Sequence, residues 1–146
     1  MRVARRAGTR AVQTVSVRDL MAHNVVTVDP RESLTDAAAQ MRTSRVGSLV
    51  VLAGAEITGI ITERDLLRAI ADGRDPATTH VSQYMTQSPR TVEADREAVQ
   101  AAALMVKHAL RHLPVTDRGQ LIGLLSARDL IALTPWPKTL PAPEPW

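Results

Sequence analysis

The feature that most constrains this chain is an internal repeat. When residue 17 is placed over residue 81, an offset of 81 − 17 = 64, the alignment runs without a gap to residues 66 and 130. Chance does not keep so many matches in one register, so the chain holds two copies of one structural unit, and two copies favour a closed pair over a solenoid. The identical pairs include Met21/Met85, Thr27/Thr91, Val28/Val92, Met41/Met105, Gly59/Gly123 and Arg64-Asp65-Leu66/Arg128-Asp129-Leu130.

Each copy is expected to follow the order strand, helix, strand, strand, helix, which predicts an α+β fold. In the first copy we expect a helical turn at 16–21, a strand at 25–28, a helix at about 33–45, strands at 48–52 and 57–62, and a helix at 63–71. In the second copy we expect a strand at 89–92, a helix at about 95–110, strands at 113–116 and 121–126, and a helix at 127–133.

Periodicity and apolar runs support these elements. Leu34, Ala37, Ala38 and Met41 recur at the spacing of one helix face. The strands are nearly continuous apolar runs, so both faces of each sheet should be covered. Small alanines on the inner face indicate close helix packing.

Composition narrows the class of protein. The chain has 146 residues, 45% of them hydrophobic, which is typical of a globular protein. It has no cysteine, which excludes disulfides and thiolate metal sites. No apolar stretch approaches the roughly 20 residues of a membrane helix, so we expect no membrane partner and a cytoplasmic location.

The two ends differ from the repeats. Residues 1–14 contain four arginines and no acid, so without them the net charge of +3 becomes −1. We expect a flexible basic arm there, and nucleic-acid binding through this arm is one alternative function. Residues 135–146 form a proline-rich tail that favours extended structure. Repeat one then spans 15–74, a linker 75–80, and repeat two 81–134.

The phrases GIITERDL (59–66) and GLLSARDL (123–130) carry the strongest functional signal. Thr62 with Asp65, and Ser126 with Asp129, have the spacing of a capping box at a helix start. The same groups could bind a nucleotide, because a helix N-terminus attracts phosphate and a carboxylate accepts ribose hydroxyls. The residues alone leave the two interpretations open. A glycine at 59 or 123 would let a second backbone or a flat base approach the strand.

The repeated motif resembles that of a tandem pair of CBS domains, and the resemblance covers residues 15–134. The motif consists of glycine, two apolar residues, Ser or Thr, any residue, Arg and Asp. The resemblance implies two units packed sheet to sheet about a pseudo-two-fold axis, with two clefts between them and further dimerisation. It also implies a regulatory sensor of AMP, ADP, ATP, S-adenosylmethionine or occasionally NAD, rather than an enzyme. Its ligand would regulate an unidentified effector protein, and no cofactor is expected.

The resemblance assigns roles residue by residue. It implies that basic residues just before the second strand of one repeat hold phosphate in the cleft of the other repeat's acid. In repeat two these residues are Arg111 and His112, which would serve the cleft of Asp65. The matching residues of repeat one, Gly47 and Ser48, would serve the cleft of Asp129 but are uncharged, so we expect nucleotides to prefer the Asp65 cleft. The Asp129 cleft should be weaker or suited to a less anionic adenosyl compound. Ribose would be bound by Thr62, Asp65, Ser126 and Asp129, phosphate by Arg64, Arg111, His112 and Arg128, and the base by backbone around Thr27, Val28, Thr91 and Val92.

Other interpretations are weaker. His108 and His112 have the spacing of a helical metal pair, but no third ligand is evident, so we expect no metal site. Arginines such as Arg42, Arg45 and Arg68 are expected to be solvated surface. A structural dimerisation module without ligand is the second alternative function.

Overall fold

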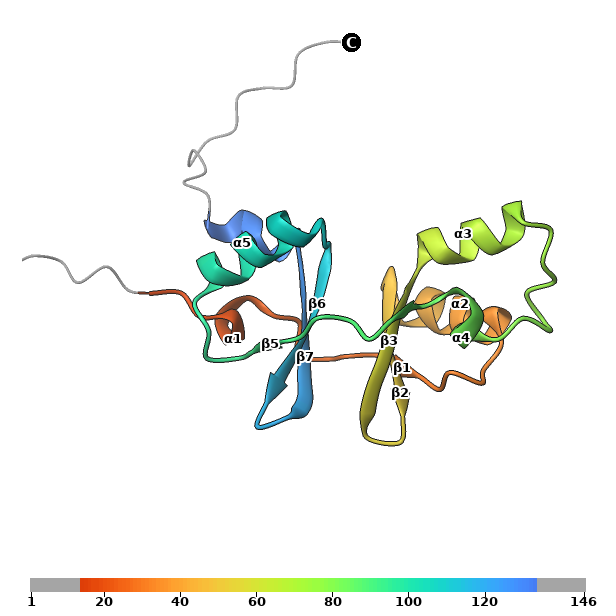
Figure 1. Cartoon of the computed structure of the whole chain (residues 1–146), viewed down its shortest axis with the longest axis horizontal. Helices are drawn as coiled ribbons and strands as arrows, with labels where there is room; N and C mark the ends of the chain where they lie inside the picture. Colours follow the sequence, from red (N-terminus) through yellow and green to blue (C-terminus); the bar gives the residue numbers. More distant parts are fainter. Residues whose placement is uncertain (1–13, 134–146) are drawn as a thin grey trace, which may run out of the picture.

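The computed structural model describes residues 14–133, so the predictions for the arm at 1–13 and for the tail from 134 onward lie outside the described residues. Two sheets face each other and the helices cover their outer faces (Figure 1). The α+β fold of two repeats packed sheet to sheet is confirmed.

The first sheet has the order β1-β2-β3-β4 and the second the order β5-β6-β7. The chain up to the second sheet contains α1 (Val17–Leu20), β1 (Thr27–Val28), α2 (Leu34–Ser44), β2 (Ser48–Ala53), β3 (Glu56–Thr62), α3 (Glu63–Ala71), α4 (Val81–Tyr84) and β4 (Thr86–Gln87). It continues with β5 (Val92–Glu93), α5 (Ala98–His108), β6 (His112–Asp117), β7 (Gln120–Ser126) and the 3-10 helix η1 (Asp129–Leu133).

The two units match down to their irregularities. In each, a two-residue strand runs parallel to the next strand, which then forms an antiparallel hairpin with its neighbour. The register of the first hairpin shifts between Val51 and Leu52, and that of the second shifts between Val115 and Thr116. The offset of 64 residues joins these positions, so the sequence repeat carries the strand bend as well as the strand order.

The sequence repeat and the folded unit are out of phase. Helix α4 opens the second sequence copy, yet Val81 and Tyr84 belong to the core of the first unit. Helix α1 opens the first copy, yet Val17 and Met21 belong to the core of the second. The first residues of each copy therefore complete the other unit (Figure 1).

Gly59 and Gly123 make this exchange possible. A Cβ on Gly59 would lie 2.5 Å from Met85 Sδ and 2.9 Å from the Thr86 carbonyl oxygen. A Cβ on Gly123 would clash with the Met21 side chain and lie 3.0 Å from the Ala22 carbonyl oxygen. Of the two uses that the sequence allowed for these glycines, the structure shows the close approach of a second backbone.

Several elements differ from the prediction. The strands expected at 25–28 and 89–92 are shorter, and β4 was not expected. The helix expected at 127–133 is a 3-10 helix that begins at Asp129. Pro135 follows within two residues and disfavours a further α-helical turn, and 3-10 geometry suits such a short segment.

Candidate functional site

Each motif aspartate accepts two hydrogen bonds through one carboxylate oxygen. Asp65 Oδ2 accepts hydrogen bonds from the Thr62 backbone N–H at 2.9 Å and from the Thr62 hydroxyl at 3.1 Å. Asp129 Oδ2 accepts the same pair of bonds from Ser126, at 2.8 Å and 3.0 Å. The predicted capping box is confirmed at Thr62, the N-cap of α3, whereas at Ser126 the same bonds close a turn before the 3-10 helix that begins at Asp129. These bonds leave the second oxygen, Oδ1, uninvolved in both repeats, so they are compatible with ligand binding.

The surroundings of the two Oδ1 atoms differ. Asp65 is 8% exposed, and its Oδ1 lies 3.6 Å from Arg68 Nη2. Asp129 is half-buried, and within residues 14–133 no ion pair involves it. Among residues 14–133, Asp129 Oδ1 thus lacks the cation contact that Arg68 makes with Asp65 Oδ1.

A pocket of about 540 Å³ joins the two units next to Arg128, and neither Asp65 nor Asp129 is among its lining residues. Arg128, the residue before Asp129, lines it from the second unit, while Gly47 and Glu63 line it from the first. Gly47, which was expected in the cleft of Asp129, thus shares a pocket with the sequence neighbour of that acid. The other lining residues are Ala38, Met41, Arg42, Arg45, Val46 and Leu66.

Arg42 and Arg45 were missed as lining residues. They were expected to be solvated surface, but Arg42 lies in the last turn of α2 and Arg45 is its C-cap, shortly before Gly47 and the start of β2. That position was the available signal, because the resemblance already placed a binding site at the start of this strand. The pocket thus has a cluster of guanidinium groups that the uncharged Gly47 and Ser48 did not predict.

Glu63 partly offsets this positive charge. An ideal Cβ on Gly47 would lie 3.3 Å from the Glu63 carboxylate, so the acid packs directly over the glycine. The Glu63 backbone N–H also donates to the Gly47 carbonyl at 3.0 Å. With three arginines and one glutamate, the lining has a formal charge of +2.

The equivalent positions on the Asp65 side have a different pattern. The offset of 64 residues replaces Arg42 and Arg45 by Val106 and Ala109, while Arg111 and Ala127 replace Gly47 and Glu63. With Arg64 in the place of Arg128, the formal charge is again +2. The two sites therefore differ in where their charge lies rather than in its amount.

His112 lies beside the motif of its own repeat. It pairs with Ser126 in the β6–β7 register. Burial lowers the pKa of His112, Arg111 lowers it further, and the Asp129 carboxylate opposes both. His112 was expected to serve the Asp65 cleft, whereas the acid whose charge acts on it in the structure is Asp129.

The other assigned residues are divided between surface and core. Arg64 and Arg111 are exposed, and the Arg111 carbonyl accepts a hydrogen bond of 2.8 Å from the Ala127 N–H. Val28 and Val92 are buried in the two cores. Their neighbours Thr27 and Thr91 are exposed, so only these threonines and the backbone are free to meet a base.

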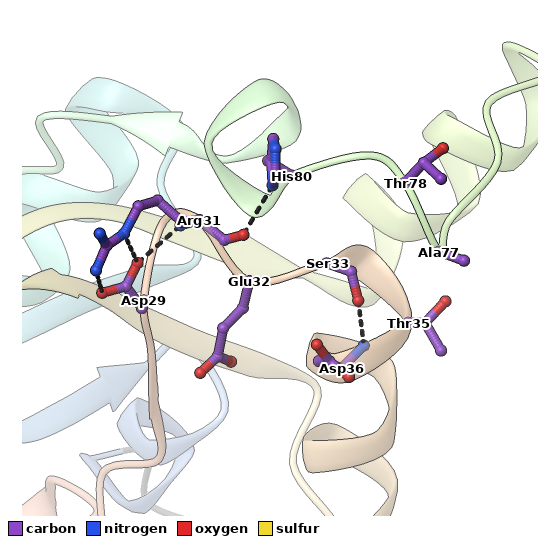
Figure 2. Close-up of a pocket in the computed structure, with 9 residues that line it drawn as sticks. All are labelled: Asp29, Arg31, Glu32, Ser33, Thr35, Asp36, Ala77, Thr78 and His80. Atoms are coloured by element: carbon purple, nitrogen blue, oxygen red, sulfur yellow. Dashed lines mark hydrogen bonds and ion pairs between the residues drawn. The ribbon is translucent and has the colours of Figure 1, made fainter.

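A larger open pocket of about 810 Å³ lies at the start of α2 (Figure 2). Ser33 caps the helix by accepting a bond of 3.1 Å from the Asp36 N–H, and Arg31 forms an ion pair with Asp29. The ring of His80 is hydrogen-bonded to the Arg31 carbonyl at 2.7 Å. These groups satisfy one another, and none of the assigned ligand residues lines this pocket.

The described residues offer neither a metal-binding cluster nor a membrane-spanning helix. In the described part of the chain, no cluster of three or more His, Cys, Asp or Glu side chains could hold a metal ion. His108 ends α5 and His112 begins β6, so the two histidines do not share a helix turn. No helix between residues 14 and 133 is long and apolar enough to span a membrane.

Comparison with known proteins identifies the two units. The model of the CBS domain family matches residues 17–72 and 81–134. An uncharacterized protein of Methanopyrus kandleri, MK0525, is 35% identical over 128 residues, which are 86% of this chain and 65% of that protein. The CBS-domain containing protein ATU1752 of Agrobacterium tumefaciens is 31% identical, with a TM-score of 0.74, over 82% of this chain and 98% of that one.

A more distant structure shares the fold with a bound ligand. The CBS domain pair of protein MJ0100, solved with 5′-methylthioadenosine and S-adenosyl-L-methionine, is 22% identical with a TM-score of 0.75. That similarity covers 82% of this chain and 95% of the other. The repeat, the two facing sheets and the family match agree, and the chain belongs to the CBS domain family as a tandem pair.

Proposed function

We propose that this CBS pair is a regulatory module that binds an adenosine-containing ligand between its two units and signals to a partner protein. The observation that carries the proposal is the arrangement of the two motif aspartates. Each bonds to Thr62 or Ser126 through Oδ2 alone and leaves Oδ1 to accept ribose hydroxyls. The complex of MJ0100 with two adenosyl compounds supports this ligand class through the shared fold.

The surrounding residues suit the rest of such a ligand. Arg128, Arg42 and Arg45 line the pocket between the two units and would supply guanidinium groups for phosphate. Arg64 and Arg111 are exposed and supply two more on the Asp65 side. AMP, ADP and ATP are the candidate ligands with phosphate, and S-adenosylmethionine is the candidate without it.

The mode of action is sensing rather than catalysis. A ligand changes the signal only if it binds one arrangement of the two units, or of a homodimer, more tightly than another. In this proposal the ligand-dependent arrangement is recognised by an effector protein. No cofactor is required by this mechanism.

A thermal-shift panel with AMP, ADP, ATP, S-adenosylmethionine, NAD and GMP tests the proposal. A ligand at about 100 times its Kd stabilises the folded state by about 2.7 kcal/mol and raises Tm by several degrees. We expect one adenosine compound to give a selective shift, and the variants Asp65→Ala and Asp129→Ala to reveal which site binds it. A nucleotide shift lost in Asp65→Ala but kept in Asp129→Ala would support the preference that the sequence predicts.

A ligand-free structural dimerisation module is the second candidate function. It is favoured by the hydrogen bonds of the two aspartates, which need no ligand, and by the burial of Asp65. An intact fold whose Tm no adenosine compound changes, together with a stable dimer in sedimentation, would support this function instead.

A further inference from the structure

Arg68 connects one of the two motif aspartates to a different part of the fold. It lies on α3, one turn after Asp65, and its Nη2 is 3.6 Å from Asp65 Oδ1. The same nitrogen donates a hydrogen bond of 2.9 Å to the backbone carbonyl of Tyr84 on α4. The guanidinium carbon also lies 5.4 Å from the centroid of the Tyr84 ring, within range of a cation–π interaction.

Tyr84 is held firmly at the other end of this connection. Tyr84 is 8% exposed, and its hydroxyl donates a hydrogen bond of 2.9 Å to Asp72 Oδ2. Helix α4 leads at once into β4, which pairs with β3 before the chain leaves for the second sheet. We call residues 81–87 the crossover segment. A change in the contacts of Tyr84 therefore affects the segment that connects the two units.

The second unit lacks this connection. The offset of 64 residues places Ala132 at the position of Arg68 and Leu20 at that of Tyr84. Neither side chain carries a charge or an aromatic ring. The contact is thus a property of the Asp65 site alone, and the Asp129 site serves as an internal control.

We propose that Arg68 is a positioning residue that transmits the state of Asp65 to the crossover segment. With Oδ1 free, the guanidinium is shared between the carboxylate and the Tyr84 carbonyl. A ligand hydroxyl that donates to Oδ1 competes with the cation, and the guanidinium then interacts more strongly with Tyr84. The identity of that ligand rests on the proposed function, whereas the coupling between Asp65 and α4 does not.

Hydrogen exchange tests the coupling without any ligand. Asp65→Asn keeps an acceptor oxygen for the cap but removes the charge that attracts Arg68. We expect the amides of the crossover segment to exchange about fivefold more slowly in Asp65→Asn, at the lower end of coupling between sites. Asp129→Asn should leave the amides of α1 unchanged, because that unit has no equivalent cation.

The double variant decides whether Arg68 carries the effect. In an Arg68→Ala background, Asp65→Asn should no longer slow exchange in the crossover segment. Arg68→Lys keeps the charge and should restore part of the effect, which a purely steric role would not. An equal response to Asp65→Asn with and without Arg68, or no response at all, would overturn the proposal.

Ligand affinity gives the reciprocal test, because coupling acts equally in both directions. The probe is 5′-methylthioadenosine, which has a ribose diol but no phosphate for Arg68 to bind. In an Asp129→Ala background, Arg68→Ala should raise its affinity for the Asp65 site about fivefold. In an Asp65→Ala background, Arg68→Ala should leave its affinity for the Asp129 site unchanged.

The outcomes separate the two proposals. Arg74→Ala removes another exposed arginine near the end of α3 and should leave the affinity of either site unchanged. Equal changes at both sites, or weaker binding at the Asp65 site, would contradict the role of Arg68. If none of the adenosine compounds binds the unsubstituted chain, the proposed function fails, while the hydrogen-exchange comparison still decides whether Asp65 and α4 are coupled.

Discussion

Asp65 and Asp129 show which contacts of a single residue can be predicted from the sequence. Their sequence spacing predicted two capping boxes; the one at Thr62 and Asp65 is confirmed, and Asp129 makes the same pair of bonds to Ser126 in a turn before the 3-10 helix. The contact between Asp65 and Arg68 is also a local, one-turn contact. Its extension to Tyr84 is not, because it depends on where α4 packs. Local backbone geometry was predictable for this reason, and the asymmetry between the two acids was not.

Removing the Asp129 carboxylate should destabilise the fold measurably. In Asp129→Ala, the Ser126 N–H and hydroxyl lose their acceptor, and we expect a loss of about 1 kcal/mol in the free energy of unfolding. Asp129→Asn keeps an acceptor and should cost less. Urea denaturation followed by circular dichroism measures both. Equal losses in the two variants would show that charge, rather than these hydrogen bonds, stabilises this helix start.

His112 makes a pH dependence predictable. Burial and Arg111 lower its pKa in the folded state from the ordinary value of 6.5, so the folded protein binds fewer protons than the unfolded one. This contribution to stability is therefore fully present above pH 6.5 and is lost as pH falls through the lowered folded pKa. We expect Tm to decrease over that window in the wild type and to change less in His112→Gln. A Tm profile between pH 5 and 8 gives the comparison, and identical profiles would contradict it.

Among the elements, the long α-helices and both hairpins were predictable because apolar periodicity and turn residues determine them locally. The glycines at the hairpin turns, Gly54 and Gly119, have positive φ of 62° and 79° as tight turns require. The short strands were harder to predict. β4 consists of Thr86 and Gln87, both exposed, and it exists only because β3 offers a neighbouring edge. Propensity is weak where tertiary pairing alone creates the element.

The close approach of Met85 and Thr86 to Gly59 predicts the cost of adding a side chain there. Gly59→Ala would place its Cβ against Met85 Sδ and the Thr86 carbonyl, and we expect a loss of about 1–3 kcal/mol in stability. Gly47→Ala is the matched control, because its Cβ would meet the flexible Glu63 side chain at 3.3 Å. It should cost less in the same denaturation experiment. If the two substitutions cost the same, the glycine at 59 is not required by the crossing backbone.

At the scale of the whole molecule, the pairing of two units followed directly from the repeat, but the exchange of their first segments did not. The repeat aligns Val17 with Val81, and both are buried, but the alignment does not show in which core. That choice depends on the length and direction of the segments that cross between the sheets. The pocket between the two units has the same origin, since Arg128 and Gly47 meet only after the two units have packed.

The exchange of the helices α1 and α4 between the two units predicts which fragments fold. A fragment of residues 15–74 follows the sequence copy but lacks Val81 and Tyr84, so we expect it to lose cooperative unfolding. A fragment of residues 23–90 follows the folded unit and contains the whole first sheet with its covering helices. It should show the more cooperative thermal transition by circular dichroism. Equal cooperativity in the two fragments would mean that α4 contributes little to the first core.

The out-of-phase arrangement also bears on how such a chain can originate. A protein with one copy of the repeat could not cover its own core, because its opening helix reaches only a neighbouring unit. Two such chains could satisfy each other by trading these helices as a domain-swapped pair. Tandem duplication of the gene would then turn a concentration-dependent association into an intramolecular one. The two halves would afterwards be free to diverge, as Arg68 and Ala132 have done.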